Sequence, residues 1–172
     1  MKTTFKWKIL LGLAFFITIG FLRIGKAQQK FEKAAFYAVM DSGDLDAINS
    51  EIAVVQASGL SNKDGYEGAL LMRKAGKVSL PGQKLKFFKA GRIKLETALL
   101  ADNDNTEFHF LRLAIEENAP KIVKYHNDIE KDKLIILKNF KNLPESVQKA
   151  ILDYCKKSKV LHAEEFSASL NR

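Results

Sequence analysis

The chain is poor in cysteine, because Cys155 is the single one among 172 residues. A disulfide framework within the chain and a cysteine-based metal cluster are therefore excluded, since each needs more than one cysteine. We interpret Cys155 as a small buried apolar side chain in a helical stretch. A role as catalytic nucleophile is disfavoured, because no pattern of histidine or acid near it would activate the thiol.

Motifs of the common enzyme classes are also missing. The sequence has no Gly-x-Gly-x-x-Gly, no phosphate-binding Gly-Lys-Ser/Thr, no His-Glu-x-x-His and no Gly-x-Ser-x-Gly. These patterns place a glycine backbone, metal ligands or a nucleophile where nucleotide, zinc and acyl-transfer chemistry need them. Only three histidines are present. We therefore predict that the protein is not an enzyme and carries no cofactor.

Acidic residues are absent from the first 27 residues, which hold five of the basic ones. The remaining 145 residues carry 23 basic and 20 acidic side chains, so most of the formal charge of +8 lies at the N-terminus. Binding to a phosphate backbone requires a concentrated basic stripe. The near balance beyond the N-terminus predicts that nucleic acid is not a partner.

The N-terminus has the order of regions found in a secretory signal peptide. A basic start is followed by 14 uncharged, mostly apolar residues, 9–22, which end at Arg23. A membrane-spanning helix needs roughly 20 apolar residues, so this run is short for a span and favours a signal peptide that is removed. Gly25 and Ala27 are small residues at the positions that precede a cleavage site, so we predict cleavage between Ala27 and Gln28. Retention of this segment as a membrane anchor is the alternative.

The predicted mature chain, residues 28–172, forms one exported helical domain, periplasmic or secreted. Its membrane contact is limited to the signal segment before cleavage. No stretch alternates apolar and polar residues as a half-buried strand would, so the fold class is all-α. Asp44, Asn127 and the pair Ser61 and Asp64 have the positions of helix N-caps. The expected helices cover residues 29–40, 44–57, 83–101, 106–118, 128–141, 144–157 and 162–170. Another follows the capping box at Ser61, includes residues 66–72 and stops at Gly76, and a further element starts at Pro120.

The long helix over residues 83–101 has one apolar side at helical spacing. The basic side chains between Lys84 and Lys94 spread around its other sides, which favours a solvated face over a nucleic-acid patch. Arg92 is expected to lie along the apolar side and to pair with Glu96 one turn later. The residues expected to face the core are Leu85, Phe87, Phe88, Leu95, Ala98 and Leu99.

The next helix places three polar residues, His109, Arg112 and Glu116, opposite Phe108 and its apolar neighbours. Such a cluster is a candidate carboxylate-binding or catalytic face. The interpretation we favour is a solvated helix face on which Arg112 and Glu116 form an ion pair four residues apart.

Two further groups contain a histidine beside acids. His126, Asp128 and Glu130 alternate along the chain, so on a helix they do not face one way and are poor metal ligands. The second group is His162, followed by Glu164 and Glu165. We interpret both groups as helix starts, where acids complement the helix dipole, and predict no metal site.

Two stretches resemble tetratricopeptide-type helical repeats. Residues 35–48, Ala-Phe-Tyr-Ala-Val-Met-Asp-Ser-Gly-Asp-Leu-Asp-Ala-Ile, resemble the end of one repeat helix, its turn and the start of the next helix. Residues 98–108 are similar to the link between two repeats. More broadly, the chain resembles small exported helical proteins of Bacteroidetes-type bacteria. The resemblance implies antiparallel helix hairpins stacked in a short, irregular array.

These observations lead to two expected functions. The first is an exported, non-catalytic helical module that binds a protein or peptide partner in a groove between helices. The alternative is an exported enzyme or small-ligand binder that uses the face formed by His109, Arg112 and Glu116.

Overall fold

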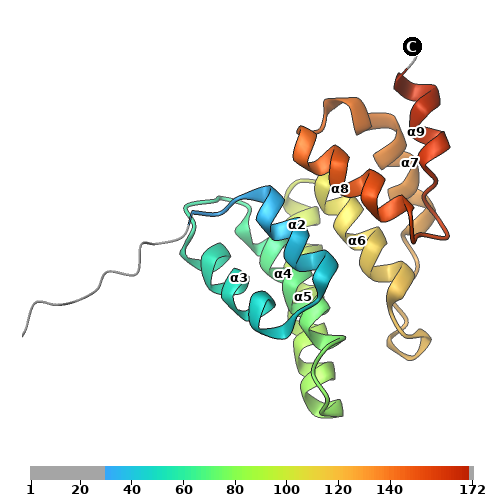
Figure 1. The fold of residues 1–172 in the computed structure, drawn as a ribbon. Coiled ribbons are helices and arrows are strands. Elements are labelled where there is room, and N and C mark those ends of the chain that lie inside the picture. Colours follow the sequence, from blue (N-terminus) through green and yellow to red (C-terminus); the bar gives the residue numbers. More distant parts are fainter. Residues whose placement is uncertain (1–29, 171–172) are drawn as a thin grey trace, which may run out of the picture.

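A computed structural model of the protein describes residues 30–170, and the predicted signal segment lies outside them (Figure 1). Within that part of the chain all regular structure is helical, which confirms the all-α prediction. None of the helices in residues 30–170 combines the length and hydropathy needed to cross a bilayer. The α-helices are α2 (Lys33–Ser42), α3 (Leu45–Ala57), α4 (Lys63–Ala75), α5 (Pro81–Ala101), α6 (Thr106–Asn118), α7 (Ile129–Asn139), α8 (Glu145–Cys155) and α9 (Ala163–Leu170), and the short 3₁₀ helices are η2 (Lys121–Val123) and η3 (Phe140–Asn142).

Local chemistry sets several of these boundaries as predicted. Gly43 ends α2 in the left-handed conformation, with φ of 63°. The Asp44 side chain accepts a hydrogen bond from Ala47 N at 2.8 Å and caps α3. In the same way, Asn105 Oδ1 accepts from Phe108 N at 3.1 Å and caps α6. These caps satisfy backbone donors that the first helical turn leaves free.

Other predicted caps are wrong. The N-cap residue of α4 is Asn62, whose side chain makes no capping hydrogen bond, so the capping box expected from Ser61 and Asp64 does not form. Asn127 is not the cap of α7, because Asp128 holds that position and the helix starts at Ile129. The predicted helix over residues 128–141 ends as the 3₁₀ turn η3, which tightens the chain before α8.

Helices α4 and α5 pack backbone against backbone at two glycines. An ideal Cβ built on Gly68 would lie 2.6 Å from Leu95 N and 2.7 Å from Gly91 O. A Cβ on Gly91 would lie 2.5 Å from Gly68 O. Only residues without a side chain allow this approach, so the two glycines set the spacing of the α4–α5 pair.

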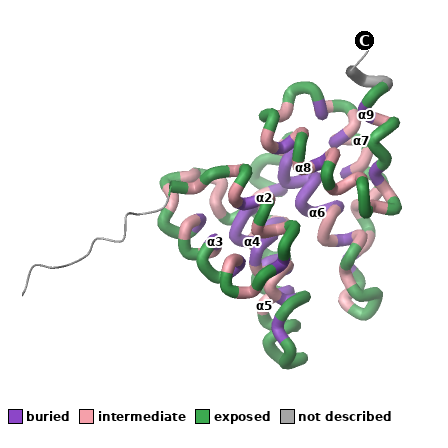
Figure 2. The backbone as a smooth tube through the Cα atoms, in the orientation of Figure 1, coloured by how far each residue is buried: buried purple, intermediate pink, exposed green. Residues whose placement is uncertain are grey.

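The buried residues form two clusters on opposite sides of α6, which runs through the middle of the molecule (Figures 1 and 2). Phe108 and Leu111 face the first cluster, which includes residues of α2 to α5. Phe110 and Leu113 face the second, which belongs to α7, α8 and α9. The helix is therefore enclosed from both sides, and its polar side chains are buried along with its apolar ones.

The predicted core side of α5 is correct over most of its length. Phe88, Leu95 and Leu99 are buried, and Phe87 and Ala98 pack partly buried against the first cluster. Leu85 is the exception, because it is 50 % exposed. The other residues at the start of α5, 81–86, are exposed as well. Helical spacing identifies the side that would be buried, but not how far the neighbouring elements extend along it.

Candidate functional site

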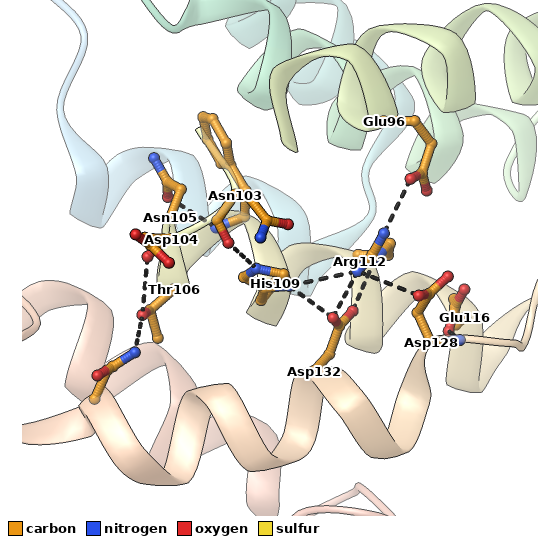
Figure 3. A network of polar contacts seen from close by, with 12 residues as sticks. Glu96, Asn103, Asp104, Asn105, Thr106, His109, Arg112, Glu116, Asp128 and Asp132 are labelled. Atoms are coloured by element: carbon orange, nitrogen blue, oxygen red, sulfur yellow. Dashed lines mark hydrogen bonds and ion pairs between the residues drawn. The ribbon is translucent and has the colours of Figure 1, made fainter. Parts of the chain in front are cut away.

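The polar side chains of α6 meet an acid from α7 inside the molecule (Figure 3). Asp132 is fully buried. Its Oδ2 accepts from Arg112 Nε at 2.8 Å, and its Oδ1 accepts from Arg112 Nη2 at 2.7 Å. The same Oδ1 lies 2.6 Å from His109 Nδ1. The two parallel bonds from one guanidinium make this the strong, bidentate form of an ion pair.

Arg112 also reaches α5 and the start of α7. Its Nη1 donates to Glu96 Oε2 at 2.9 Å, and its Nη2 lies 3.6 Å from Asp128 Oδ1. Glu96 in turn accepts a hydrogen bond from the Tyr125 hydroxyl. Burial alone would lower the pKa of Arg112, but the hydrogen bonds and charge of Asp132 outweigh it and raise that pKa. One guanidinium therefore ties α5, α6 and α7 together.

The ring of His109 is closed off on both sides. Its Nε2 lies 2.8 Å from the carbonyl oxygen of Asn103, and its Nδ1 faces Asp132. Both partners are acceptors, so only the imidazolium form donates to both at once. The side chain is fully buried. Neither nitrogen is open to a substrate, and a general acid or base needs such access.

Glu116 is buried one turn after Arg112. Its Oε2 accepts from the backbone N–H of Asp128 at 3.1 Å, so it fixes the N-terminus of α7. Burial, together with the charges of Asp128 and Asp132, raises the pKa of Glu116 to about 7. The predicted ion pair with Arg112 is replaced by this backbone contact.

The interpretation of His109, Arg112 and Glu116 as a solvated face is thus wrong. Their exposed fractions are 0 %, 5 % and 1 %. The structure does bring the three residues together, but it covers them with α7. A signal of this was present in the sequence: Phe110 and Leu113 point away from Phe108, so α6 is apolar on more than one side, which is typical of a buried helix.

The central acid of the network, Asp132, was not among the predicted site residues, and neither was its neighbour Glu96. Both lie far along the chain from Arg112. Arg92, which was expected to pair with Glu96, is exposed and lies over the Tyr125 ring, 4.8 Å from its centroid. No spacing within a single helix indicates such pairs.

A second polar cluster joins α2, α4 and the start of α6. Glu107 is buried and forms an ion pair with Lys33. Its Oε1 accepts a hydrogen bond from the Tyr37 hydroxyl at 3.0 Å, and its Oε2 accepts one from the Tyr66 hydroxyl at 3.0 Å. Burial, with the charge of Glu107, raises the pKa of both tyrosines. Their hydroxyls therefore stay protonated as donors. This cluster was not predicted from the sequence, because its members come from three separate helices that are far apart along the chain.

Two open depressions lie near this cluster: Glu107 lines the first, and its partners Lys33 and Tyr66 line the second. The first, of about 510 Å³, is lined mainly by polar side chains from the start of α6, the end of α7 and η3, among them Glu107, Asn139 and Asn142. The second, of about 520 Å³, is bounded by α2, α4 and Ser146 of α8, with Phe31 and Leu60 as apolar walls. These are the concave surfaces through which this part of the molecule can be reached from solvent.

The groups considered for metal binding have structural contacts. His126 Nε2 lies 2.9 Å from the carbonyl oxygen of Ala119. The Glu165 side chain accepts from His162 N at 3.0 Å at the start of α9, as expected for a helix start. Among residues 30–170 no group of histidine, cysteine and acid side chains is arranged to hold a metal ion.

Cys155 lies partly buried against the second cluster, between α8 and α9. Burial, with the charge of Glu165, raises the pKa of its thiol to about 11. The thiol therefore stays protonated near neutral pH, whereas a nucleophile must be a thiolate.

Comparison of the chain with protein-family models, with curated proteins and with solved structures finds no match. The structure itself is therefore the ground on which a function is inferred.

Proposed function

We propose that this protein is an exported, non-catalytic helical module that binds a peptide segment of a protein partner. One observation carries the proposal: the ionisable side chains that would serve an active site are buried and paired with one another, whereas the open surfaces are shallow depressions. Ion pairs such as Arg112–Asp132 fix the arrangement of helices. The two depressions near the cluster of Glu107, Lys33 and Tyr66 are open to another molecule.

The chemistry of these depressions suits an extended peptide. Phe31 and Leu60 offer an apolar wall for one side chain of the ligand. In the first depression, Asn142 offers amide donors and acceptors for a peptide backbone, and Asn139, whose Nδ2 also donates to Thr106 Oγ1 at 3.0 Å, lies beside it. Small-molecule sites are instead more enclosed and mostly apolar. This is the reason for preferring a peptide over the alternative of a small-ligand binder or enzyme.

Selection from a random peptide library on the immobilised full chain tests the proposal. Ala34 is exposed and lines the second depression, so Ala34→Arg should block it. Ala53→Arg is a matched control, because Ala53 is an exposed helical alanine of α3 outside both depressions. We expect selected peptides to lose affinity for Ala34→Arg and to keep it for Ala53→Arg. Selection of no peptide, or equal loss in both variants, would contradict the proposal.

Export is the second part of the proposal, and it rests on the sequence of residues 1–27. Mass spectrometry of the intact protein from an expressing Gram-negative host measures it directly. We expect the mass of a chain that begins at Gln28. A chain that keeps Met1 to Ala27 and sediments with membranes would favour the anchor instead.

A further inference from the structure

An exposed strip of α5, which starts at Leu85 on the border of the core side, carries aliphatic and basic side chains. Three large apolar residues on it are strongly exposed: Leu85 at 50 %, Ile93 at 67 % and Leu100 at 85 %. Lys86 and Lys89, both exposed, lie between them. At 100° per residue these five side chains fall within an arc of about 100°. We call them the outer face of α5.

The first part of this face lies in a basic stretch of the chain. From Gly68 to Leu95 the sequence contains eight basic residues and no acidic one. Glu96 follows on the same side of α5, and an ion pair with Arg112 at 2.9 Å neutralises it. Lys94 is neutralised by ion pairs with Asp64 and Glu67. In contrast, Lys86 and Lys89 take part in none of the ion pairs formed among residues 30–170, so their charges are available to a partner.

The shape of the molecule presents this face outward. The first turns of α5 form the lower end of the molecule in Figure 1, and most of that end is exposed in Figure 2. Leu80, directly before α5, is 59 % exposed. Leu80 and Leu85 lie at this protruding end, and Ile93 and Leu100 continue the exposed aliphatic line along the helix. A line of exposed apolar side chains beside lysines on one helix face is typical of a surface-binding amphipathic helix.

We propose that the outer face of α5 binds the surface of an anionic lipid bilayer. Leu85, Ile93 and Leu100 would enter the boundary between headgroups and acyl chains, while the lysines extend their amines to the lipid phosphates. Charge complementarity with anionic lipids selects this partner. The outer face shares no residue with the two depressions, so this inference is independent of the proposed peptide binding.

Other occupants fit the face less well. Nucleic acid binds through basic side chains that contact its phosphates and through exposed aromatic rings that stack on its bases. Three exposed aliphatic side chains provide neither kind of contact. Phe87, the nearest ring, is partly buried, with Lys74 Nζ 4.3 Å from its centroid. A second copy of the chain would bring together two faces of the same positive sign.

A local fluorescent reporter tests binding by this face in the processed protein that begins at Gln28. Trp7 is the only tryptophan of the sequence, so the processed chain has none, and Ile93→Trp gives it a single indole, on the outer face. We expect vesicles of phosphatidylcholine and phosphatidylglycerol to shift its emission to the blue and brominated lipids to quench it. Vesicles of phosphatidylcholine alone should do so much less.

Charge reversal then identifies the surface. In the reporter background, Lys86→Glu with Lys89→Glu should lower the vesicle partition coefficient by at least about tenfold. Lys131→Glu with Lys141→Glu is the matched control, because both lysines are exposed on the other half of the molecule. It should leave the coefficient nearly unchanged.

Three results would overturn the inference. The indole could stay unshifted while the chain sediments with vesicles, which would place binding elsewhere. Both charge reversals could weaken binding equally, which would show a non-specific attraction. Duplex DNA or an acidic peptide could shift the indole when vesicles do not, which would assign the face to that partner.

Discussion

Replacing Gly68 by alanine tests the close packing of α4 on α5. In an exposed helix interior this exchange stabilises a protein by about 1 kcal/mol, because alanine has the higher helix propensity. At Gly68 the new Cβ would lie 2.6 Å from Leu95 N and 2.7 Å from Gly91 O. Both neighbours are backbone atoms of α5, so no side-chain rotation can relieve the clash.

The steric effect should outweigh the propensity gain. Overpacking a core typically costs about 1–3 kcal/mol, and here a whole helix must shift to restore contact distances. We expect the free energy of unfolding of Gly68→Ala to fall by about 2 kcal/mol net, which for a chain of this size lowers Tm by about 4–8 °C. Urea and thermal unfolding followed by circular dichroism measure both quantities.

Gly82→Ala is the matched control for this prediction. Gly82 also lies in α5, but a Cβ there would meet no atom within 4 Å. This variant should be as stable as the parent or slightly more stable. If Gly68→Ala behaves like Gly82→Ala, the two helices are not in backbone contact, and the spacing assigned to the glycine pair is wrong.

Three further predictions concern buried side chains. Asp132→Asn should lower the free energy of unfolding by about 3 kcal/mol, because Arg112 loses the fully buried one of its charged partners and keeps the more exposed Glu96 and Asp128. The exposed neighbour change Glu130→Gln should alter it little, and equal effects in urea unfolding would argue against the buried network. The pKa of Glu116 in the folded protein is about 7 and exceeds its ordinary value of 4.5. Between these two pH values the folded state therefore binds a proton that the unfolded state has released. The free energy of unfolding should therefore fall by up to about 3 kcal/mol as the pH rises from about 4.5 to about 7, and Glu116→Gln should flatten this slope. Leu95→Ala should cost about 2–5 kcal/mol, whereas Leu85→Ala, at a half-exposed position, should cost far less; similar melting temperatures for the two would contradict the assigned sides of α5.

The features that sequence analysis predicted correctly depend on neighbours along the chain. The end of α5 at Ala101 and the start of α6 at Thr106 lie at the predicted positions, on the two sides of the polar turn 102–105, and the Asp44 cap of α3 forms as predicted. Capping involves residues within three positions of each other, so the local sequence contains the needed information. The same holds for the burial of Phe88, Leu95 and Leu99, which helical periodicity places on one side.

The features that it missed depend on which helices meet. Arg112 is 20 residues from Asp132, and Lys33 is 74 residues from Glu107. Whether a polar residue on a helix faces water or another helix is decided by the tertiary arrangement. The interpretation of His109, Arg112 and Glu116 failed for this reason, since it assumed that α6 has one covered side.

The position of α6 between the two buried clusters also bears on the order in which the chain can fold. Synthesis delivers α2 to α5 first, and the apolar side chains that later pack against Phe108 and Leu111 are then not yet covered by α6. The cover arrives only when residue 118 has emerged, and the same helix is needed by α7 to α9. A break in the chain on either side of α6 would leave one half with an open core. The two halves of the molecule therefore complete their cores together, through the one helix that both share.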